Sequence, residues 1–527
     1  MKNRSIAAAA VLSSALITGG WLVERESTAP ARTRDARVHL FDEVLDHVRR
    51  EYVDTLADST LYRHAVEGAL RELHDPHTVL LDARRLSSLD ESTSGHYAGV
   101  GIQMDVRDSG VSVLGTLPGS PAEQAGIVIG DRIVSIDGRL TRTFTSDEAL
   151  KSLRGAAGSV VQLVVERAGV PERIPFALTR RTIAVNPAQH ALLLRDSVGY
   201  VKLTIFSAAA ATDLTRAVDS LRAAGARSLV LDLRGDPGGL LGQGIDVADL
   251  FLDARQAIVS TRGRAPEETQ AFADRAPQRW ADMPMVVLTD SSSASASEIV
   301  AGALQDHDRA LIVGTATYGK GSAQRVFRFG DRGLKLTTAL WYTPNGRSIN
   351  RPRAPVRDMN DPTPPRDSLP PRPAFKTDGG RTVLGGGGIV PDVEIAKAVP
   401  TPADRTLLRV LGARVPRFRD AIVAYALSMK ASHGVTDPDF TVTQAMRDEL
   451  YGRMEARGLV VSRAAYDSAA PAVTRALSSQ LSRYVFGPQA EFLRALKADT
   501  VLARATQLLH GVHTPKELLG RVAASGT

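Results

Sequence analysis

The sequence predicts a multidomain α/β protein, with a β-rich domain inserted into an α/β core and helical segments on both sides. The chain has 527 residues, enough for three or four domains. Apolar strands alternate with helical patterns over residues 183–400, apart from a Pro-rich insertion near residues 352–373. Short strands and turns fill residues 93–182. Apolar residues at helical spacing dominate an N-terminal segment (32–92) and a C-terminal accessory region (401–527).

The first 31 residues have the pattern of a targeting segment. Lys2 and Arg4 precede an apolar run from Ile6 to Val23, as in a secretory signal. The run has about 18 residues, close to the shortest helix that spans a bilayer. We therefore expect residues 1–31 to be a signal peptide or a membrane anchor, and the protein to reach the periplasm or the cell envelope.

Composition excludes several kinds of site. The chain has no cysteines, which rules out disulfides, thiolate metal sites and a cysteine nucleophile. The formal net charge is +7, but aromatic residues make up only 5% and the arginines are scattered, whereas a nucleic-acid surface needs a dense basic stripe. His74 and His77 lie close together in the sequence without further candidate ligands. We expect no nucleic-acid partner, no metal and no other cofactor.

Residues 93–182 combine strands, turns and two helices, and their motifs are specific. Strands are expected at residues 111–117, 133–138 and 160–167, and a capping box at Thr145 to Glu148 begins a helix. The motifs are Gly119-Ser-Pro-Ala-Glu-Gln-Ala-Gly126, Gly130-Asp131 and Ile133-Val-Ser-Ile-Asp-Gly138. They resemble the circularly permuted PDZ domains of bacterial proteases.

The resemblance to PDZ domains implies a peptide-binding function for this region. Such domains add a peptide strand to a sheet edge and hold its C-terminal carboxylate on backbone N–H groups. The loop that matches the carboxylate-binding loop consists of Gly99, Val100, Gly101 and Ile102, for which an ordinary β-turn between strands is the alternative. The implied partners are protein or peptide substrates with apolar C-termini.

In the α/β core, two expected strands end directly at motifs that can carry chemistry. The strand Ser228 to Arg234 runs into Gly235-Asp-Pro-Gly-Gly239, and the strand Met283 to Thr289 runs into Ser291-Ser-Ser-Ala-Ser295. A third strand is expected at residues 311–314. Binding and catalytic sites of α/β folds lie at the carboxyl ends of such strands.

A serine at the beginning of the helix after Thr289 is the candidate nucleophile. Ser295 would expose its hydroxyl where the free N–H groups of the helix favour negative charge. The N–H of Ala296 could donate to an oxyanion, and the loop at Gly238 and Gly239 could supply a second donor. From the sequence alone a serine-rich helix cap is the alternative, and the rival nucleophiles are Ser291, Ser292, Ser293 and Ser297.

Lys320 is the candidate base for this serine, whose hydroxyl is a weak nucleophile without one. It lies between two glycines, just past the strand 311–314, in an arginine-rich chain. A lysine can act as a base where burial or a like charge lowers its pKa, whereas arginine keeps its proton. Gln324 could orient the amine. The alternative is a solvated loop lysine.

Five core motifs occur together: Leu231-Asp-Leu-Arg-Gly-Asp-Pro-Gly-Gly239, Ser293-Ala-Ser-Ala-Ser-Glu-Ile299, Val313-Gly314, Tyr318-Gly-Lys-Gly-Ser-Ala-Gln324 and Tyr342-Thr-Pro-Asn-Gly-Arg-Ser-Ile349. This set resembles the carboxyl-terminal processing (tail-specific) serine proteases, over residues 38–396. The resemblance implies that Ser295 is the nucleophile, Lys320 its base and Gln324 the support of the lysine. It also implies an oxyanion hole made by Ala296 and by Gly238 or Gly239.

The expected function is that of an envelope endopeptidase with a PDZ domain, acting through an acyl-enzyme. The resemblance further implies that peptide in the PDZ groove aligns Ser295 with Lys320. An activating adaptor, an N-terminal membrane tether and a homo-oligomer are additional partners to consider. A trypsin-like protease is disfavoured because no Gly-x-Ser-Gly-Gly motif is present. The alternative from another class is a catalytically silent PDZ scaffold.

Overall fold

The computed structural model describes residues 38–107, 110–351, 372–396 and 399–525. The expected targeting segment and nearly all of the Pro-rich insertion lie outside the described residues. Within the described ranges, no helix is both long and apolar enough to cross a membrane. The chain divides into two compact units, a smaller one (residues 1–83 and 324–337) and a larger one (residues 84–323 and 338–527).

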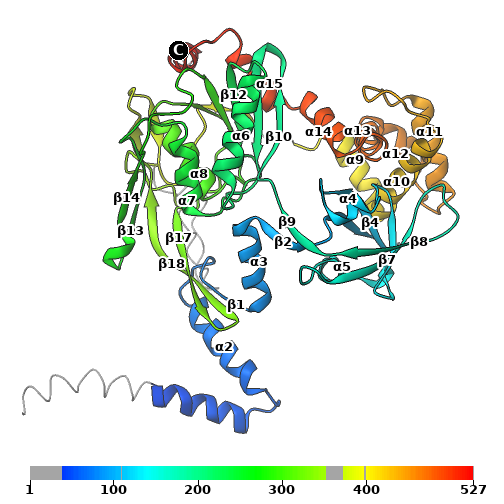
Figure 1. Ribbon diagram of the computed structural model, residues 1–527, viewed down its shortest axis with the longest axis horizontal. Helices are drawn as coiled ribbons and strands as arrows, with labels where there is room; N and C mark the ends of the chain where they lie inside the picture. The colour runs from blue at the N-terminus through cyan, green and yellow to red at the C-terminus, as the bar shows by residue number, and fades with distance from the viewer. Residues whose placement is uncertain (1–37, 108–109, 352–371, 397–398, 526–527) are drawn as a thin grey trace, which may run out of the picture. The chain divides into compact units, whose positions relative to one another are not determined.

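The smaller unit contains N-terminal helices and a short strand. A helix over residues 38–51 is followed by α2 (Asp58–Arg71) and β1 (Val79–Leu81), drawn in blue in Figure 1. β1 pairs antiparallel with the part of β18 in this unit, where Val79 lies opposite Lys335. The helical pattern predicted from the apolar spacing is thus present.

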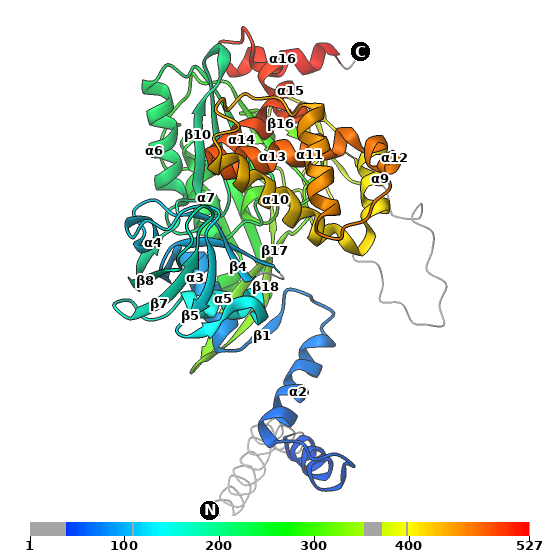
Figure 2. The same cartoon turned by 90° about the vertical axis from the view of Figure 1, so that its right-hand side faces the viewer.

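A six-stranded sheet forms the centre of the larger unit (Figures 1 and 2). In spatial order its strands are β10 (Ala188–Leu193), β11 (Val198–Leu203), β12 (Ser228–Asp232), β15 (Met285–Thr289), β16 (Leu311–Gly314) and β21 (Val393–Glu394). Only β10 runs antiparallel to its neighbour within this described sheet. The carboxyl ends of β12, β15 and β16 therefore lie at one edge, where the predicted motifs follow them.

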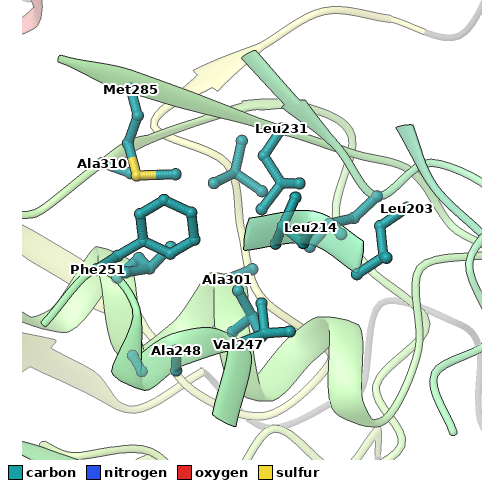
Figure 3. Close-up of a cluster of buried hydrophobic side chains, with 14 of the residues drawn as sticks. Leu203, Leu214, Leu231, Val247, Ala248, Phe251, Met285, Ala301 and Ala310 are labelled. Atoms are coloured by element: carbon teal, nitrogen blue, oxygen red, sulfur yellow. The ribbon is translucent and has the colours of Figure 1, made fainter. Parts of the chain in front are cut away.

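Helices cover both faces of this sheet. α6 (Ala210–Ala223), α7 (Leu241–Asp249) and α8 (Ala296–Asp306) pack on one face, and Figure 3 shows Leu214, Val247 and Ala301 in that core. Alternate residues of a strand point to opposite faces, and Leu502 and Leu508 of α15 (Thr500–Leu509) pack on the second face. Burial on both faces explains why the strands read as continuous apolar runs.

Further strands lie outside the central sheet. Their bounds are β13 (Ala257–Gly263), β14 (Gln270–Ala273), β17 (Ser322–Phe329), β18 (Arg332–Tyr342), β19 (Ala374–Lys376) and β20 (Thr382–Leu384). β13 pairs antiparallel with β14 and with the end of β18, where Ser260 lies opposite Tyr342. β19 and β20 form an antiparallel pair.

The β-rich insertion is a PDZ domain. Its sheet contains β3 (Ile102–Arg107), β4 (Gly110–Thr116), β5 (Arg132–Ile136), β6 (Arg139–Leu140), β7 (Val160–Glu166) and β8 (Ile174–Thr179). Its helices are α4 (Pro121–Gln124) and α5 (Ser146–Leu153), and Thr145 caps α5 in the predicted capping box with Glu148. α3 (Ala83–Ser94) and the antiparallel pair of β2 (His96–Gly99) and β9 (Arg181–Ala184) lead into and out of it.

The C-terminal region is helical, as predicted, but its helices pack in two places. α9 (Pro402–Leu411), α10 (Val415–Ala431), α11 (Gln444–Glu455), α12 (Arg463–Ser468) and α13 (Ala470–Leu481) share one apolar core. A π-helical turn at Ser482–Phe486 leads to α14 (Pro488–Lys497), α15 and α16 (Pro515–Ser525). The predicted fold class, an α/β core with an inserted PDZ domain and flanking helices, is confirmed.

Candidate active site

Ser295 occupies a sharp turn between β15 and α8. Its φ is 55° and its ψ −113°, a left-handed conformation that serine adopts only where surrounding contacts enforce it. The N–H of Glu298 donates to the backbone carbonyl of Ser295 at 2.9 Å, so the serine hydroxyl is not required to cap the helix. Ser295 is half-buried at the edge of the sheet where the strand motifs meet.

The rival serines differ from Ser295 in burial and hydrogen bonding. The hydroxyls of Ser293 and Ser297 are buried and donate to backbone carbonyls of the loop after β12, at 2.8 and 3.0 Å. They hold the turn against that loop and are poorly placed to react. Ser291 and Ser292 are exposed, away from the beginning of the helix. Ser295 remains our candidate nucleophile.

The glycine loop after β12 passes directly beside Ser295. Gly238 has a φ of +90°, and a Cβ placed on it would lie 2.8 Å from both the Cβ of Ser295 and the backbone nitrogen of Ala296. Only a glycine fits this approach, because any larger residue would collide with the turn. The structure thus brings together the two segments that we predicted to form an oxyanion hole.

The two glycines of this loop differ in their hydrogen bonds. The N–H of Gly238 donates to the Oδ1 atom of Asp236 at 2.8 Å, and its carbonyl accepts from the N–H of Phe206 at 3.0 Å. The C=O and N–H of a trans peptide point in opposite directions. The N–H of Gly239 therefore points away from Phe206, and it is a better candidate for an oxyanion donor than the engaged N–H of Gly238.

The buried carboxylate of Glu298 connects the serine turn to the lysine turn. Its Oε2 atom accepts from the backbone N–H groups of Ser295 and Lys320, at 2.8 and 2.9 Å. Its Oε1 atom accepts from the hydroxyl of Thr317 at 2.5 Å and from the N–H of Gly319 at 2.7 Å. Burial raises the pKa of Glu298, whereas these four hydrogen bonds act to lower it.

Further backbone contacts fix the turn that carries Lys320. The N–H of Tyr318 donates to the carbonyl of Ser293 at 3.0 Å. Gly319 has a φ of +88°, and a Cβ there would lie 3.1 Å from the nitrogen of Gly388. Lys320 itself is half-buried. Its backbone is thus held close to the serine turn by contacts on both sides.

Gln324 belongs to the smaller unit, whereas Lys320 belongs to the larger one. The side-chain amide of Gln324 donates to the hydroxyl of Thr337 within its own unit, at 3.3 Å. The expected support of Lys320 by Gln324 therefore stays a prediction.

A network of charged side chains supports the end of β12, and sequence reasoning did not find it. Arg234 donates to both oxygens of Asp232, at 2.9 and 2.6 Å, and its guanidinium also lies 2.7 Å from a carboxylate oxygen of Asp499. The hydroxyl of Tyr200 donates to Asp232 at 2.7 Å. Burial opposes the charge of Asp232, but the bonded Arg234 holds its pKa below the ordinary value. The Asp-Leu-Arg spacing was a usable signal, whereas nothing in the sequence linked Asp499 to it.

Asp236 is a second buried carboxyl group in this region. Burial raises its pKa to about 7, although the hydrogen bond from the N–H of Gly238 acts in the opposite direction. In the part of the chain that the structure describes, no group of three or more His, Asp or Glu side chains is placed to hold a metal ion.

The loop predicted to bind the peptide carboxylate leads into the edge strand of the PDZ sheet. Gly99 ends β2, and the side chain of Val100 is buried in the PDZ core. Gly101 has a φ of +79°, and a Cβ there would collide with Ser120. Ile102 begins β3, which is the edge strand of its sheet and packs against α5. An edge strand beside a helix is the arrangement that peptide addition requires.

The fold and this site define a peptidase with a PDZ domain. Residues 197–355 match the family model described as Peptidase family S41. Residues 113–167 match the model described as PDZ domain. The first match covers β11 to β18, including the glycine loop, the serine turn and the lysine turn.

Curated relatives specify the family further. The chain is 38% identical over 314 residues to the carboxy-terminal-processing protease of Bartonella bacilliformis, covering 59% of this chain and 71% of the relative. It is 41% identical over 292 residues to the carboxyl-terminal-processing protease of Picosynechococcus, covering 54% and 70%. A solved photosystem II D1 C-terminal processing protease is 29% identical, with coverage of 71% and 90% and a TM-score of 0.37. The chain belongs to the carboxy-terminal processing serine proteases.

Proposed function

We propose that this protein is an endopeptidase of the cell envelope that cleaves by a dyad of Ser295 and Lys320 after its PDZ domain has captured the C-terminus of a substrate. The family and the PDZ domain follow from the sequence matches. The dyad, the acyl-enzyme and the envelope location are our proposals.

The proposed reaction has two stages. The amine of Lys320 accepts the proton of Ser295 as the serine oxygen attacks the amide carbonyl. The N–H groups of Ala296 and Gly239 donate to the oxyanion that forms. Lys320 then returns the proton to the leaving amine, which leaves an ester on Ser295. Water hydrolyses the ester, with Lys320 again acting as the base and then returning the proton to Ser295.

One observation carries this proposal: a single carboxylate oxygen of Glu298 binds the backbone N–H groups of both Ser295 and Lys320. The two residues lie 25 positions apart in the sequence, on different turns. A shared buried acceptor keeps both turns in a fixed relation, as a nucleophile and its base require. A scaffold without catalytic function has no need of this connection.

The PDZ domain supplies the proposed substrate selection. The glycine-containing loop at residues 99–102 leads into the edge strand β3, beside α5. We propose that this groove holds the apolar C-terminus of a protein substrate and that occupation of the groove favours alignment of Ser295 with Lys320. An activating adaptor and assembly into a homo-oligomer are compatible with this proposal.

The decisive experiment is cleavage of an unstructured reporter that ends in apolar residues. Ser295→Ala and Lys320→Ala should each lose activity by about 10³-fold or more. Lys320→Arg should be equally inactive, because it keeps the charge but cannot accept the proton. Ser291→Ala, which alters an exposed serine of the same segment, is the matched control and should cleave like wild type.

Other results would contradict the proposed dyad or the proposed protease function. Cleavage by Ser295→Ala would show that another serine or another mechanism is responsible. Activity of Lys320→Arg would exclude the lysine as the base. Absence of cleavage by every form, with and without a candidate adaptor, would favour the silent PDZ scaffold.

The envelope location is proposed from the charged and apolar pattern of residues 1–31. Cell fractionation of the full chain should find it outside the cytoplasm. A shortened mature form would indicate a cleaved signal, and a full-length form in the membrane fraction would indicate an anchor. A cytoplasmic full-length protein would contradict the proposal.

A further inference from the structure

Asp236 is a buried carboxyl group whose two oxygens differ in their partners. Oδ1 accepts from the N–H of Gly238 at 2.8 Å. Oδ2 is also buried, and among the described residues it meets no hydrogen-bond donor. The hydroxyl of Ser297 also acts to lower the pKa of Asp236, but burial outweighs both donors and favours the neutral acid.

The backbone of Asp236 is attached to the turn that carries Ser295. Its carbonyl accepts from the N–H of Ala294 and from the hydroxyl of Ser297, both at 3.0 Å. Gly238, which the Asp236 side chain holds, lies so close to Ser295 that a Cβ on it would collide with the serine. Asp236 thus links the glycine loop to the serine turn through both its backbone and its side chain.

The charged groups on the elements packed around this loop leave Asp236 without a paired cation. Lys202 of β11 acts to lower the pKa of Asp236, but the ammonium donates to the carbonyl of Arg234 at 2.9 Å. The guanidinium of Arg234 is engaged by Asp232 and Asp499. On the serine side, Asp290 accepts from the N–H of Gly235, and Glu298 of α8 accepts its four hydrogen bonds.

We propose that Asp236 is the positioning residue of the oxyanion loop and that it works as the neutral acid. The hydrogen bond from the N–H of Gly238 to Asp236 fixes the loop. The peptide group between Gly238 and Gly239 then presents the N–H of Gly239 beside Ser295. This inference rests on the proposed function, because it assumes that an oxyanion forms at Ser295.

The neutral form is preferred for an electrostatic reason. The tetrahedral intermediate carries a negative charge on the oxygen that the donors next to Asp236 bind. An ionised carboxylate of Asp236 repels this charge across a medium of low polarity. The raised pKa of Asp236, about 7, lies in the range where proteases work. Activity should therefore fall as Asp236 ionises, in addition to any dependence on the dyad.

The test compares kcat of Asp236→Asn with that of wild type across pH, on the unstructured reporter with apolar C-terminal residues. Asparagine keeps an oxygen that accepts the N–H of Gly238, and it cannot ionise. Both proteins retain Lys320, so the titration of the dyad cancels in the ratio. The ratio of variant to wild type should rise about tenfold between pH 6 and pH 8, as expected for loss of one ionisation near 7.

Two further variants separate positioning from general stability. Asp236→Ala removes the acceptor and should lower kcat by about 10²-fold at every pH, with KM changed less than about threefold. Asp246→Asn, which removes an exposed carboxylate of α7, is the matched control and should give a flat ratio. Circular dichroism and thermal unfolding identify a variant that fails to fold. In that case the pH dependence of the Asp236→Asn ratio still decides whether Asp236 works as the neutral acid.

A flat Asp236→Asn ratio across pH would overturn the neutral-acid role, and a falling ratio would show that the ionised form is the working one. Equal kcat for Asp236→Ala and wild type would overturn the positioning role. Ser295→Ala is run beside them. If it cleaves the reporter, the proposed function fails. If it is inactive while the Asp236 variants behave like wild type, only this inference fails.

Discussion

Glu298 shows how much of the proposed site depends on one side chain. It lies in the first turn of α8, is fully buried and accepts hydrogen bonds from four donors on two turns. A carboxylate is the only side chain of this length that offers two oxygens and no donor. The sequence places Glu298 in the serine motif, and the structure shows its contacts to Thr317, Gly319 and Lys320.

Glu298→Gln should therefore be damaging although it is nearly isosteric. Its amide NH2 group must take the place of one of the two carboxylate oxygens. A donor then faces N–H or O–H donors at a position where they need an acceptor. We expect a loss of about 2–4 kcal/mol in the free energy of unfolding and at least a tenfold lower kcat. Urea unfolding and reporter cleavage measure the two effects.

A matched control for this substitution is Glu67→Gln. Glu67 is a partly exposed residue of α2 and forms an ion pair with Arg63, at 3.2 Å. We expect a change of less than about 1 kcal/mol, since surface ion pairs contribute little. Equal unfolding curves and equal kcat values for Glu298→Gln and wild type would exclude a linking role for Glu298.

At the scale of elements, α15 belongs to the α/β core although it lies in the C-terminal accessory region. It contributes Leu502, Ala505 and Leu508 to the apolar layer on the second face of the central sheet. The residue before it, Asp499, forms an ion pair with Arg234 at the end of β12. The helix thus covers the sheet and contacts the residue that precedes the glycine loop.

Leu508→Ala should destabilise the core by about 2–4 kcal/mol, because it opens a cavity between α15 and the sheet. The matched control is Leu408→Ala on α9. Leu508 is 5% exposed and Leu408 is 54% exposed. Thermal or urea unfolding should separate the two variants clearly. Equal unfolding midpoints would mean that α15 is not packed on the sheet in solution.

At the scale of the whole molecule, the chain joins a peptide-binding domain to a peptidase. The PDZ domain follows α3 and returns to the core through the pair of β2 and β9. In the proposed mechanism, substrate capture and cleavage are carried out by different parts of one chain. We expect that a long C-terminal tail binds first at the PDZ groove and presents a more distant bond to Ser295, the proposed nucleophile.

Removing the substrate's terminal carboxylate tests whether the PDZ domain captures the substrate by its C-terminus. A reporter with an amidated C-terminus should show at least a tenfold lower kcat/KM, because the carboxylate contacts at the PDZ loop are lost. The control is the same peptide acetylated at its N-terminus, which loses the other terminal charge and should be cleaved as before. Equal kcat/KM for the amidated and free reporters would exclude carboxylate capture as the basis of selection.

Much of the local structure could be predicted from the sequence because local signals specify it. The capping box at Thr145, the strand at residues 311–314 and the glycine loop after β12 all lie where the pattern placed them. Apolar periodicity and turn residues act over a few positions, so they can be recognised without knowledge of the fold.

By itself, the sequence determined the fold class, the family and the short list of candidate residues, because these depend on composition, periodicity and motifs along the chain. The tertiary structure decided which distant residues meet. It engaged the hydroxyls of Ser293 and Ser297, occupied the N–H of Gly238 with Asp236, and placed Asp499 against Arg234. Such contacts arise from the packing of separate elements, and burial then raises the pKa of groups such as Asp236, which no local pattern records.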